Sequence, residues 1–280
     1  MRFGFHVSIA GSLAKAIDRA VQKECETIQI FTRSPRMWRV KDLDEKDVSS
    51  FKKRLKEERI SPVFSHMPYL PNLAAPDDGT YKKSVEALEL EMVRAAQLEI
   101  PFVVTHLGSH KGKGRDFGIN RTVVAIQRAL EVDSKATILL ENTSGRKNTI
   151  GARFEDIAEI IEKCDSDNRL GICYDTAHGF SAGYDIRSPE ITAKTFQDLD
   201  ATIGLDRLKL IHANDTHGEF QSGKDHHEHI GKGFISEEGF RSLLHHEPLR
   251  DLPVILETPQ EKDKLEDDLR NIRLLRRLAA

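Results

Sequence analysis

Nine consecutive residues, DHHEHIGKG at positions 225–233, begin with two acids and three histidines in five positions. Imidazole and carboxylate groups are common protein ligands of divalent metal ions. Asp225 and His227 alternate along this segment, so an extended backbone would turn both side chains to the same side. A histidine-rich tract is also typical of a solvated polar loop, and the segment alone leaves both interpretations open.

Residues of the same types end a series of short apolar runs elsewhere in the chain. The eight terminal residues of these runs are His6, Thr32, His66, His106, Glu141, Asp175, His212 and Glu257. Histidines and acids are depleted in buried strands, so seven of them at eight such positions are poorly explained as separate hydrogen-bonded strand caps. The pattern indicates that they share one site.

The number of ligand-type residues predicts more than one metal ion. Imidazole and carboxylate without thiolate suit Zn²⁺, Mn²⁺ or Fe²⁺. A tetrahedral zinc ion takes four ligands, so two ions are satisfied, if a carboxylate bridges them, by His66, His106, Glu141, Asp175, His212 and Glu257. His178 lies three residues after Asp175 and can reach the same place. We therefore expect a third ion on His178, Asp225 and His227, with His6 as a neighbouring histidine.

Eight apolar, β-branched runs must position these residues, and stretches of helical periodicity separate them. The predicted strands span residues 3–8, 27–33, 62–67, 102–108, 137–143, 171–178, 208–215 and 253–259. Helices are predicted at 44–59, 81–98 and 264–279, among others. Alternation of strands and helices implies parallel strands with right-handed crossovers.

Eight such units favour a closed (β/α)₈ TIM barrel over an open doubly wound sheet. No linker or shift in composition divides the chain, so residues 1–280 are expected to form a single barrel domain. The carboxyl ends of all strands then lie on one face, where their terminal side chains converge. The predicted metal site lies at this face.

The composition excludes several classes of protein. Forty-two basic and 45 acidic residues give a formal charge of −3, so a nucleic acid could bind only to a local basic patch. Cys25, Cys164 and Cys173 are odd in number and lack a C-x-x-C spacing, which favours free thiols and a cytoplasmic location. The sequence shows no signal-peptide pattern and no apolar run long enough to cross a membrane. We also expect the protein to be a monomer.

Seven motifs, in order along nearly the whole chain, resemble those of the endonuclease IV family of zinc-dependent abasic-site endonucleases. They are FHVSIAGSL (5–13), HMPYLPNLA (66–74), THLGSHKG (105–112), ENTSG (141–145), DTAHGFSAGYD (175–185), HANDTHGEFQSGKDHHEHIGKG (212–233) and LETP (256–259). The resemblance implies three zinc ions: one on His66, His106 and Glu141, one on Glu141, Asp175, His212 and Glu257, and one on His178, Asp225 and His227. One departure is His226, where several relatives have arginine.

The resemblance also implies the reaction, which is hydrolysis of the phosphodiester on the 5′ side of an abasic nucleotide. The products are a 3′-hydroxyl and a 5′-deoxyribose phosphate. Water bound to zinc ionises near pH 7, so a hydroxide that bridges two ions is the expected nucleophile. Glu141 and Glu257 are expected to orient it, and no nucleophilic side chain is required.

Damaged double-stranded DNA is the partner that this reaction requires. Basic residues follow several of the predicted strands and could contact phosphates, namely Arg33, Arg36, Arg39, Lys111, Lys113, Arg115, Arg146, Lys147, Lys224 and Lys232. By resemblance, Arg36, Tyr69 and Leu70 enter the duplex at the lesion. The alternative for Tyr69 and Leu70 is ordinary packing of a loop.

Other functions are compatible with parts of the pattern. A metal-dependent sugar isomerase or epimerase has the same architecture but needs about two ions and has no use for Asp225, His227 or an arginine-bearing second loop. A metal-storing or nucleic-acid-binding protein would bind DNA without cutting it. A nuclease acting on ultraviolet photoproducts would differ in the lesion that it cuts.

Overall fold

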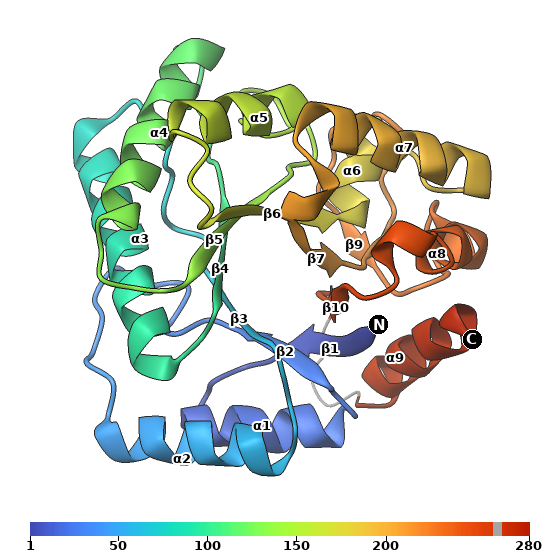
Figure 1. The fold of residues 1–280 in the computed structure, drawn as a ribbon, viewed down its shortest axis with the longest axis horizontal. Coiled ribbons are helices and arrows are strands. Elements are labelled where there is room, and N and C mark those ends of the chain that lie inside the picture. Colours follow the sequence, from blue (N-terminus) through green and yellow to red (C-terminus); the bar gives the residue numbers. More distant parts are fainter. Residues whose placement is uncertain (260–264) are drawn as a thin grey trace.

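A computed structural model describes residues 1–259 and 265–280 of the chain. Eight parallel strands close into a barrel in the order β1-β10-β7-β6-β5-β4-β3-β2 (Figure 1). These strands are β1 (Arg2–His6), β2 (Thr27–Ile30), β3 (Val63–His66), β4 (Phe102–His106), β5 (Thr137–Glu141), β6 (Leu170–Asp175), β7 (Leu208–His212) and β10 (Pro253–Leu256). The predicted eight-stranded barrel is confirmed.

Helices surround the barrel on the outside (Figure 1). They are α1 (Leu13–Gln22), α2 (Glu45–Glu57), α3 (Asp78–Leu98), α4 (Arg115–Leu130), α5 (Phe154–Lys163), α6 (Thr176–Ala182), α7 (Pro189–Thr202), α8 (Ser236–Leu244) and α9 (Leu265–Ala279), with 3₁₀ turns η1 (Leu205–Arg207) and η2 (Glu247–Leu249). A small antiparallel pair, β8 (Asp215–Thr216) and β9 (His227–Glu228), extends beyond the barrel after β7. The predicted helix at 264–279 is found as α9, and its first residue lies outside the described part of the chain.

All eight predicted strands are too long at their carboxyl ends, and for three of them the difference changes the position of a predicted site residue. Strand β2 ends at Ile30, so Thr32 lies in the following loop and does not end a strand. Strand β10 ends at Leu256, which places Glu257 one residue beyond it. The strand predicted at 171–178 is wrong for its last three residues, which belong to helix α6. The Asp175 carboxylate accepts a hydrogen bond from the His178 backbone N–H at 2.8 Å and thereby caps this helix.

The interior of the barrel contains its own apolar layer, which explains where the polar ligand-type residues point. This layer forms a cluster separate from the main core and consists of Phe64, Val104, Leu139, Cys173, Leu210 and Ile255. Each member lies two positions before a predicted metal ligand, and side chains two apart along a strand face the same way. The ligands therefore form the next layer toward the carboxyl ends, with an apolar plug beneath them.

The remaining core lies between the barrel and the helices, as the amphipathic periodicity predicts. Cys25, Cys164 and Cys173 are free and buried, which confirms the expectation of unpaired thiols. Burial raises the pKa of the Cys173 thiol to about 12, so this side chain stays neutral near neutral pH. No helix among the described residues is both long and apolar enough to cross a membrane.

Closure of the barrel depends on a close approach at Gly4. Gly4 pairs with Thr27 between β1 and β2, and a Cβ atom at Gly4 would lie 1.7 Å from the Thr27 carbonyl oxygen. We expect Gly4→Ala to lower the free energy of unfolding by about 3 kcal/mol or to prevent folding, since backbone cannot yield as a side chain can. Urea denaturation followed by circular dichroism measures this.

Gly79→Ala is the matched control. Gly79 lies in the first turn of α3, where the nearest atom to a new Cβ is an Asp77 side-chain oxygen at an ordinary 3.5 Å. Equal free energies of unfolding for the two variants would show that β1 and β2 can move apart without loss of stability, which would contradict the importance of their close approach at Gly4.

Candidate metal centre

Five successive strands end on the residues that the sequence singled out. His66, His106, Glu141, Asp175 and His212 are the last residues of β3, β4, β5, β6 and β7 in turn. Because the strands are parallel, these side chains share the carboxyl face of the barrel. Glu257 follows β10 at the same face, and the structure thus brings together all six residues predicted for two ions.

Glu141 joins two of the ligand groups. Its Oε2 atom lies 3.0 Å from His66 Nε2 and 3.6 Å from His106 Nε2. Its Oε1 atom lies 3.3 Å from His212 Nδ1, in a second group that also contains Asp175 and Glu257. One fully buried carboxylate thus directs a different oxygen to each group, which is the geometry of a bridging ligand.

A third group forms around His178 and His227. The compact set here is Asp175, His178 and His227, whose ligand atoms lie within 4.8 Å of one another. Asp225 lies at the edge of this set, with Oδ1 3.1 Å from His178 Nε2 and 3.7 Å from His227 Nε2. Its side chain is 51% exposed, whereas the Asp175 side chain is fully buried. Asp225 therefore faces solvent at the mouth of the cluster.

Three of these histidines are held so that one ring nitrogen faces the cluster. His66 Nδ1 donates to the Met67 carbonyl at 2.7 Å, His178 Nδ1 to the Asn142 carbonyl at 3.0 Å, and His227 Nδ1 to the Glu257 carbonyl at 3.1 Å. A histidine that donates from Nδ1 keeps the Nε2 lone pair for a metal. His227 Nε2 is buried without a hydrogen-bond partner, as expected for an atom whose partner is a metal ion.

The charges within the cluster are complementary. Burial would raise the pKa of Glu141, yet the positive potential of His106 and His212 and a hydrogen bond from His178 lower it well below its usual range. The pKa of Glu257 is lowered in the same way, against burial, mainly by His212 and His6. Conversely, Asp175 and Asp225 raise the pKa of His178 despite desolvation. The carboxylates thus require positive charge, which metal ions supply without protons.

The histidine-rich segment at 225–233 is held against the barrel by Asp215. In the β8–β9 pair, Thr216 lies opposite His227, which brings the histidine back over the strand ends. The Asp215 carboxylate accepts backbone hydrogen bonds from Gly231, Gly233 and Ile235 at 3.0, 2.9 and 3.0 Å. A Cβ at Gly233 would lie 2.4 Å from Asp215 Oδ1, which explains why glycine occupies this position.

Sequence reasoning missed two asparagines that hold the ligands. Asn142 follows Glu141 directly, and its side chain pairs with the Asp175 backbone by donating to the carbonyl at 3.0 Å and accepting from the N–H at 2.7 Å. Asn214 donates to Asp175 Oδ2 at 2.7 Å and accepts from the Glu257 backbone N–H at 2.7 Å. Their position just after a strand-end ligand was the available signal.

The residues predicted to enter DNA lie beside the cluster. A cavity of about 990 Å³ is lined by Arg36 and Tyr69 together with His106, Asp225 and other residues of the same face. The Tyr69 side chain is 69% exposed and Leu70 is 38% exposed. Tyr69 also packs edge-on against Phe31, with ring centroids 5.2 Å apart, so both loop packing and contact with DNA stay open predictions for these two residues.

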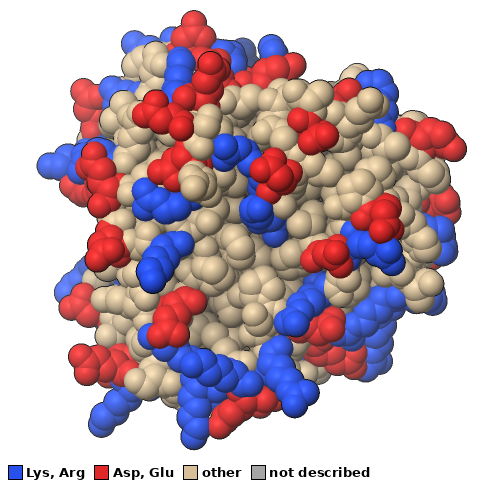
Figure 2. Space-filling model, in the orientation of Figure 1, with Lys and Arg blue, Asp and Glu red and all other residues tan. Residues whose placement is uncertain are grey.

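Some of the basic residues predicted to contact DNA form ion pairs within the protein instead. Arg33 is buried 3.8 Å from Glu91, and Arg115 forms ion pairs of 2.7 Å with both Asp156 and Glu159. Acidic and basic side chains are mixed on the face shown in Figure 2, in keeping with the small net charge. Any DNA-binding patch is therefore local to the loops around the cluster.

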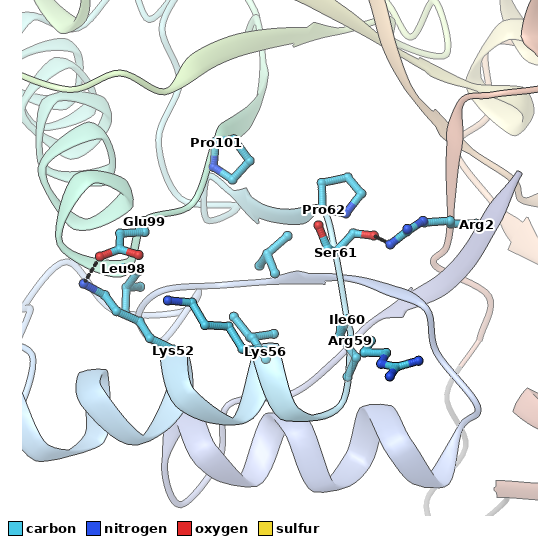
Figure 3. A pocket seen from close by; sticks show the side chains of 12 residues that line it. Arg2, Lys52, Lys56, Arg59, Ile60, Ser61, Pro62, Leu98, Glu99 and Pro101 are labelled. Carbon is cyan, nitrogen blue, oxygen red and sulfur yellow. Dashed lines mark hydrogen bonds and ion pairs between the residues drawn. The ribbon is translucent and has the colours of Figure 1, made fainter.

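A separate cavity of about 490 Å³ lies at the opposite end of the barrel, where β3 begins. Basic side chains, including Lys56 and Arg59, line it together with apolar ones such as Ile60 and Leu98 (Figure 3). Two of its basic residues are engaged, because Lys52 pairs with Glu99 at 2.9 Å and Arg2 donates to the Ser61 carbonyl at 2.6 Å (Figure 3). None of the metal-ligand groups named above lies here.

Comparison with known proteins agrees with this geometry. The family model described as xylose isomerase-like TIM barrel matches residues 17–277. A probable endonuclease 4 of Methanoculleus marisnigri is 47% identical over 99% of this chain and 98% of its own, and one of Nitrosopumilus maritimus is 43% identical over the full length of both. The crystal structure of endonuclease IV from Thermus thermophilus superposes with a TM-score of 0.88 at 35% identity, over 99% of this chain and 98% of that one.

A D-tagatose 3-epimerase-like protein also superposes, with a TM-score of 0.76 at 21% identity over 99% of this chain and 97% of that one, which reflects the shared barrel alone. The endonucleases also match over the full length, but at much higher sequence identity. The chain therefore belongs to the endonuclease IV family, and the prediction of a DNA-repair nuclease from its motifs is confirmed.

Proposed function

We propose that the protein hydrolyses the phosphodiester on the 5′ side of an abasic nucleotide in double-stranded DNA, leaving a 3′-hydroxyl and a 5′-deoxyribose phosphate. The observation that carries this proposal is the shared carboxylate of Glu141, which presents one oxygen to each of two adjacent ligand groups. Paired metal sites of this kind stabilise the attacking and leaving oxygens of a phosphodiester displacement.

We assign three zinc ions to the cluster. The first has His66, His106 and Glu141, the second Glu141, Asp175, His212 and Glu257, and the third His178, Asp225 and His227. Imidazole and carboxylate ligands suit zinc. Cys173 lies one layer below and is no competitor, since burial keeps its thiol protonated. Zinc bound here would supply Lewis acidity and a hydroxide nucleophile at neutral pH.

The chain's own groups would bind and orient the substrate. Glu141 and Glu257, both ionised within the cluster, would hold the attacking oxygen in line as well as ligate metal. The exposed carboxylate of Asp225 lies at the mouth of the cluster, so a metal ion held by His178, Asp225 and His227 would lie near solvent and could neutralise the phosphate and the departing 3′ oxygen. The apolar plug beneath the ligands excludes water from below.

Recognition of the lesion would depend on Arg36, Tyr69 and Leu70. These side chains project from the β2–α2 and β3–α3 loops beside the cluster, where they can enter the gap left by a missing base. We further propose that residues 1–280 act as one catalytic domain and as a monomer in the cytoplasm. Three unpaired, buried cysteines suit that reducing compartment.

A duplex that carries one tetrahydrofuran abasic analogue tests the proposed reaction. We expect a single incision on the 5′ side of the analogue, loss of activity after prolonged chelation, and its return with Zn²⁺. Gel mapping of both product ends measures the position of the cut, with an intact duplex as control. Incision on the 3′ side, or full activity in metal-free protein, would contradict the proposal.

Asp225→Asn tests the separate role of the third position. We expect the rate of incision to fall by about 100-fold or more, because the third metal position loses its charged ligand, while the zinc on the deeper strand-end ligands stays bound. Single-turnover kinetics and zinc content by mass spectrometry measure the two effects. Glu219→Gln removes an exposed carboxylate from the same loop and should change neither. Loss of all zinc from Asp225→Asn would show that the cluster assembles only as a unit.

Combined Tyr69→Ala and Leu70→Ala changes test the wedge. A missing base leaves a gap that is cheap to open, whereas insertion into intact duplex must displace a paired base at a cost of a few kcal/mol. We therefore expect binding to abasic duplex to weaken by about 10-fold or more, with binding to intact duplex nearly unchanged. Fluorescence anisotropy with both duplexes measures this.

Val93→Ala with Val124→Ala is the control, because these exposed apolar side chains lie on helices α3 and α4. A fall in thermal stability and in both affinities after the Tyr69 and Leu70 changes would favour loop packing over a wedge.

A further inference from the structure

We propose that Gln29 is a positioning residue that sets the orientation of two metal ligands, His212 and Glu257, through the two ends of one side-chain amide. This inference rests on the proposed metal centre. Gln29 is a fully buried residue of β2, paired in register with His6 of β1. The apolar pattern predicts Thr32 as the terminal residue of this strand and gives no sign of a role for Gln29.

The two ends of the amide contact different ligands. Gln29 Oε1 lies 2.9 Å from His212 Nε2, and Gln29 Nε2 donates to Glu257 Oε1 at 2.6 Å. The carboxylate accepts only, so it fixes which end of the amide faces it. The amide oxygen is thereby directed at the imidazole, which must donate from Nε2.

This donor assignment determines how His212 can bind metal. With its proton on Nε2, the imidazole keeps the Nδ1 lone pair, and Nδ1 lies 3.3 Å from Glu141 Oε1 and 3.5 Å from Glu257 Oε2. These are the oxygens of the second ligand group. Gln29 would thus direct the lone pair of His212 and an oxygen of Glu257 to the same ion.

The contrast with the other histidines shows why a side chain matters here. His66, His178 and His227 are held by backbone carbonyls, which no substitution removes. His212 is held by a side chain that simultaneously binds a second ligand. Residues that hold metal ligands in this manner typically contribute about 10- to 100-fold to metal affinity.

The neighbouring His6 completes the arrangement on the carboxylate. His6 Nδ1 lies 2.9 Å from Glu257 Oε1 and 3.0 Å from Gln29 Nε2. Glu257 Oε1 is therefore held by groups from β1 and β2, which leaves Oε2 directed at His212. The carboxylate lies beyond the end of its own strand, so these contacts take the place of strand geometry in fixing it.

Gln29→Leu and Gln29→Met, two apolar replacements of similar size, test the inference in the absence of DNA. We expect zinc affinity at the weakest site to fall by about 10- to 100-fold in competition with a chelator. We also expect the visible absorption bands of the cobalt-substituted protein to change, because the ligand geometry at the second position changes. A purely structural role would alter stability without altering the cobalt spectrum.

Thr27→Val is the matched control. Thr27 is fully buried on the same strand and face as Gln29, but its hydroxyl donates to the Pro62 carbonyl at the other end of the barrel. Metal affinity and cobalt spectra of both Gln29 variants that equal those of Thr27→Val would overturn the inference and leave the proposed function standing. Wild-type protein that binds neither zinc nor cobalt would overturn both.

Discussion

The candidate metal centre depends on one buried carboxylate, that of Glu141, which lies among imidazoles at the end of a barrel strand. An isolated buried carboxylate would take up a proton, yet three histidines keep the pKa of Glu141 low. Both of its oxygens are used, one toward His66 and His106 and the other toward His212. Two ligand groups are thereby held at a fixed separation, and the third group adjoins them through Asp175.

Barrel geometry supplies the rest of the positioning. The apolar layer of Phe64, Val104 and their neighbours packs the strands together inside the barrel. The ligands lie two residues further along each strand, on the same side and closer to solvent. Loop carbonyls then set the protonated nitrogen of His66, His178 and His227. The Asp215 carboxylate binds the glycine-containing segment that brings His227 over the strand ends. Rigid strands thus carry the deep ligands, while loops carry the residues that we propose to contact DNA.

The sequence predicted the barrel and the residues of its metal face because both follow from simple periodicities. Strand ends were less predictable: Asp175 ends β6 by capping α6, a local hydrogen bond that apolar patterning does not reveal. Gln29 was missed for a related reason, since an amide in an apolar strand has no distinctive pattern until its neighbours are known. Arg33 and Arg115 have partners from elsewhere in the chain, Glu91 and Asp156, so their ion pairs could not be read from local sequence.

Anomalous X-ray diffraction from zinc-loaded crystals, recorded on both sides of the zinc absorption edge, tests the central claim most directly. The account predicts three zinc peaks at the carboxyl face, two of them on opposite oxygens of Glu141 and the third beside His178 and His227. Occupancy of a single position, or zinc peaks that do not contact Glu141, would contradict it.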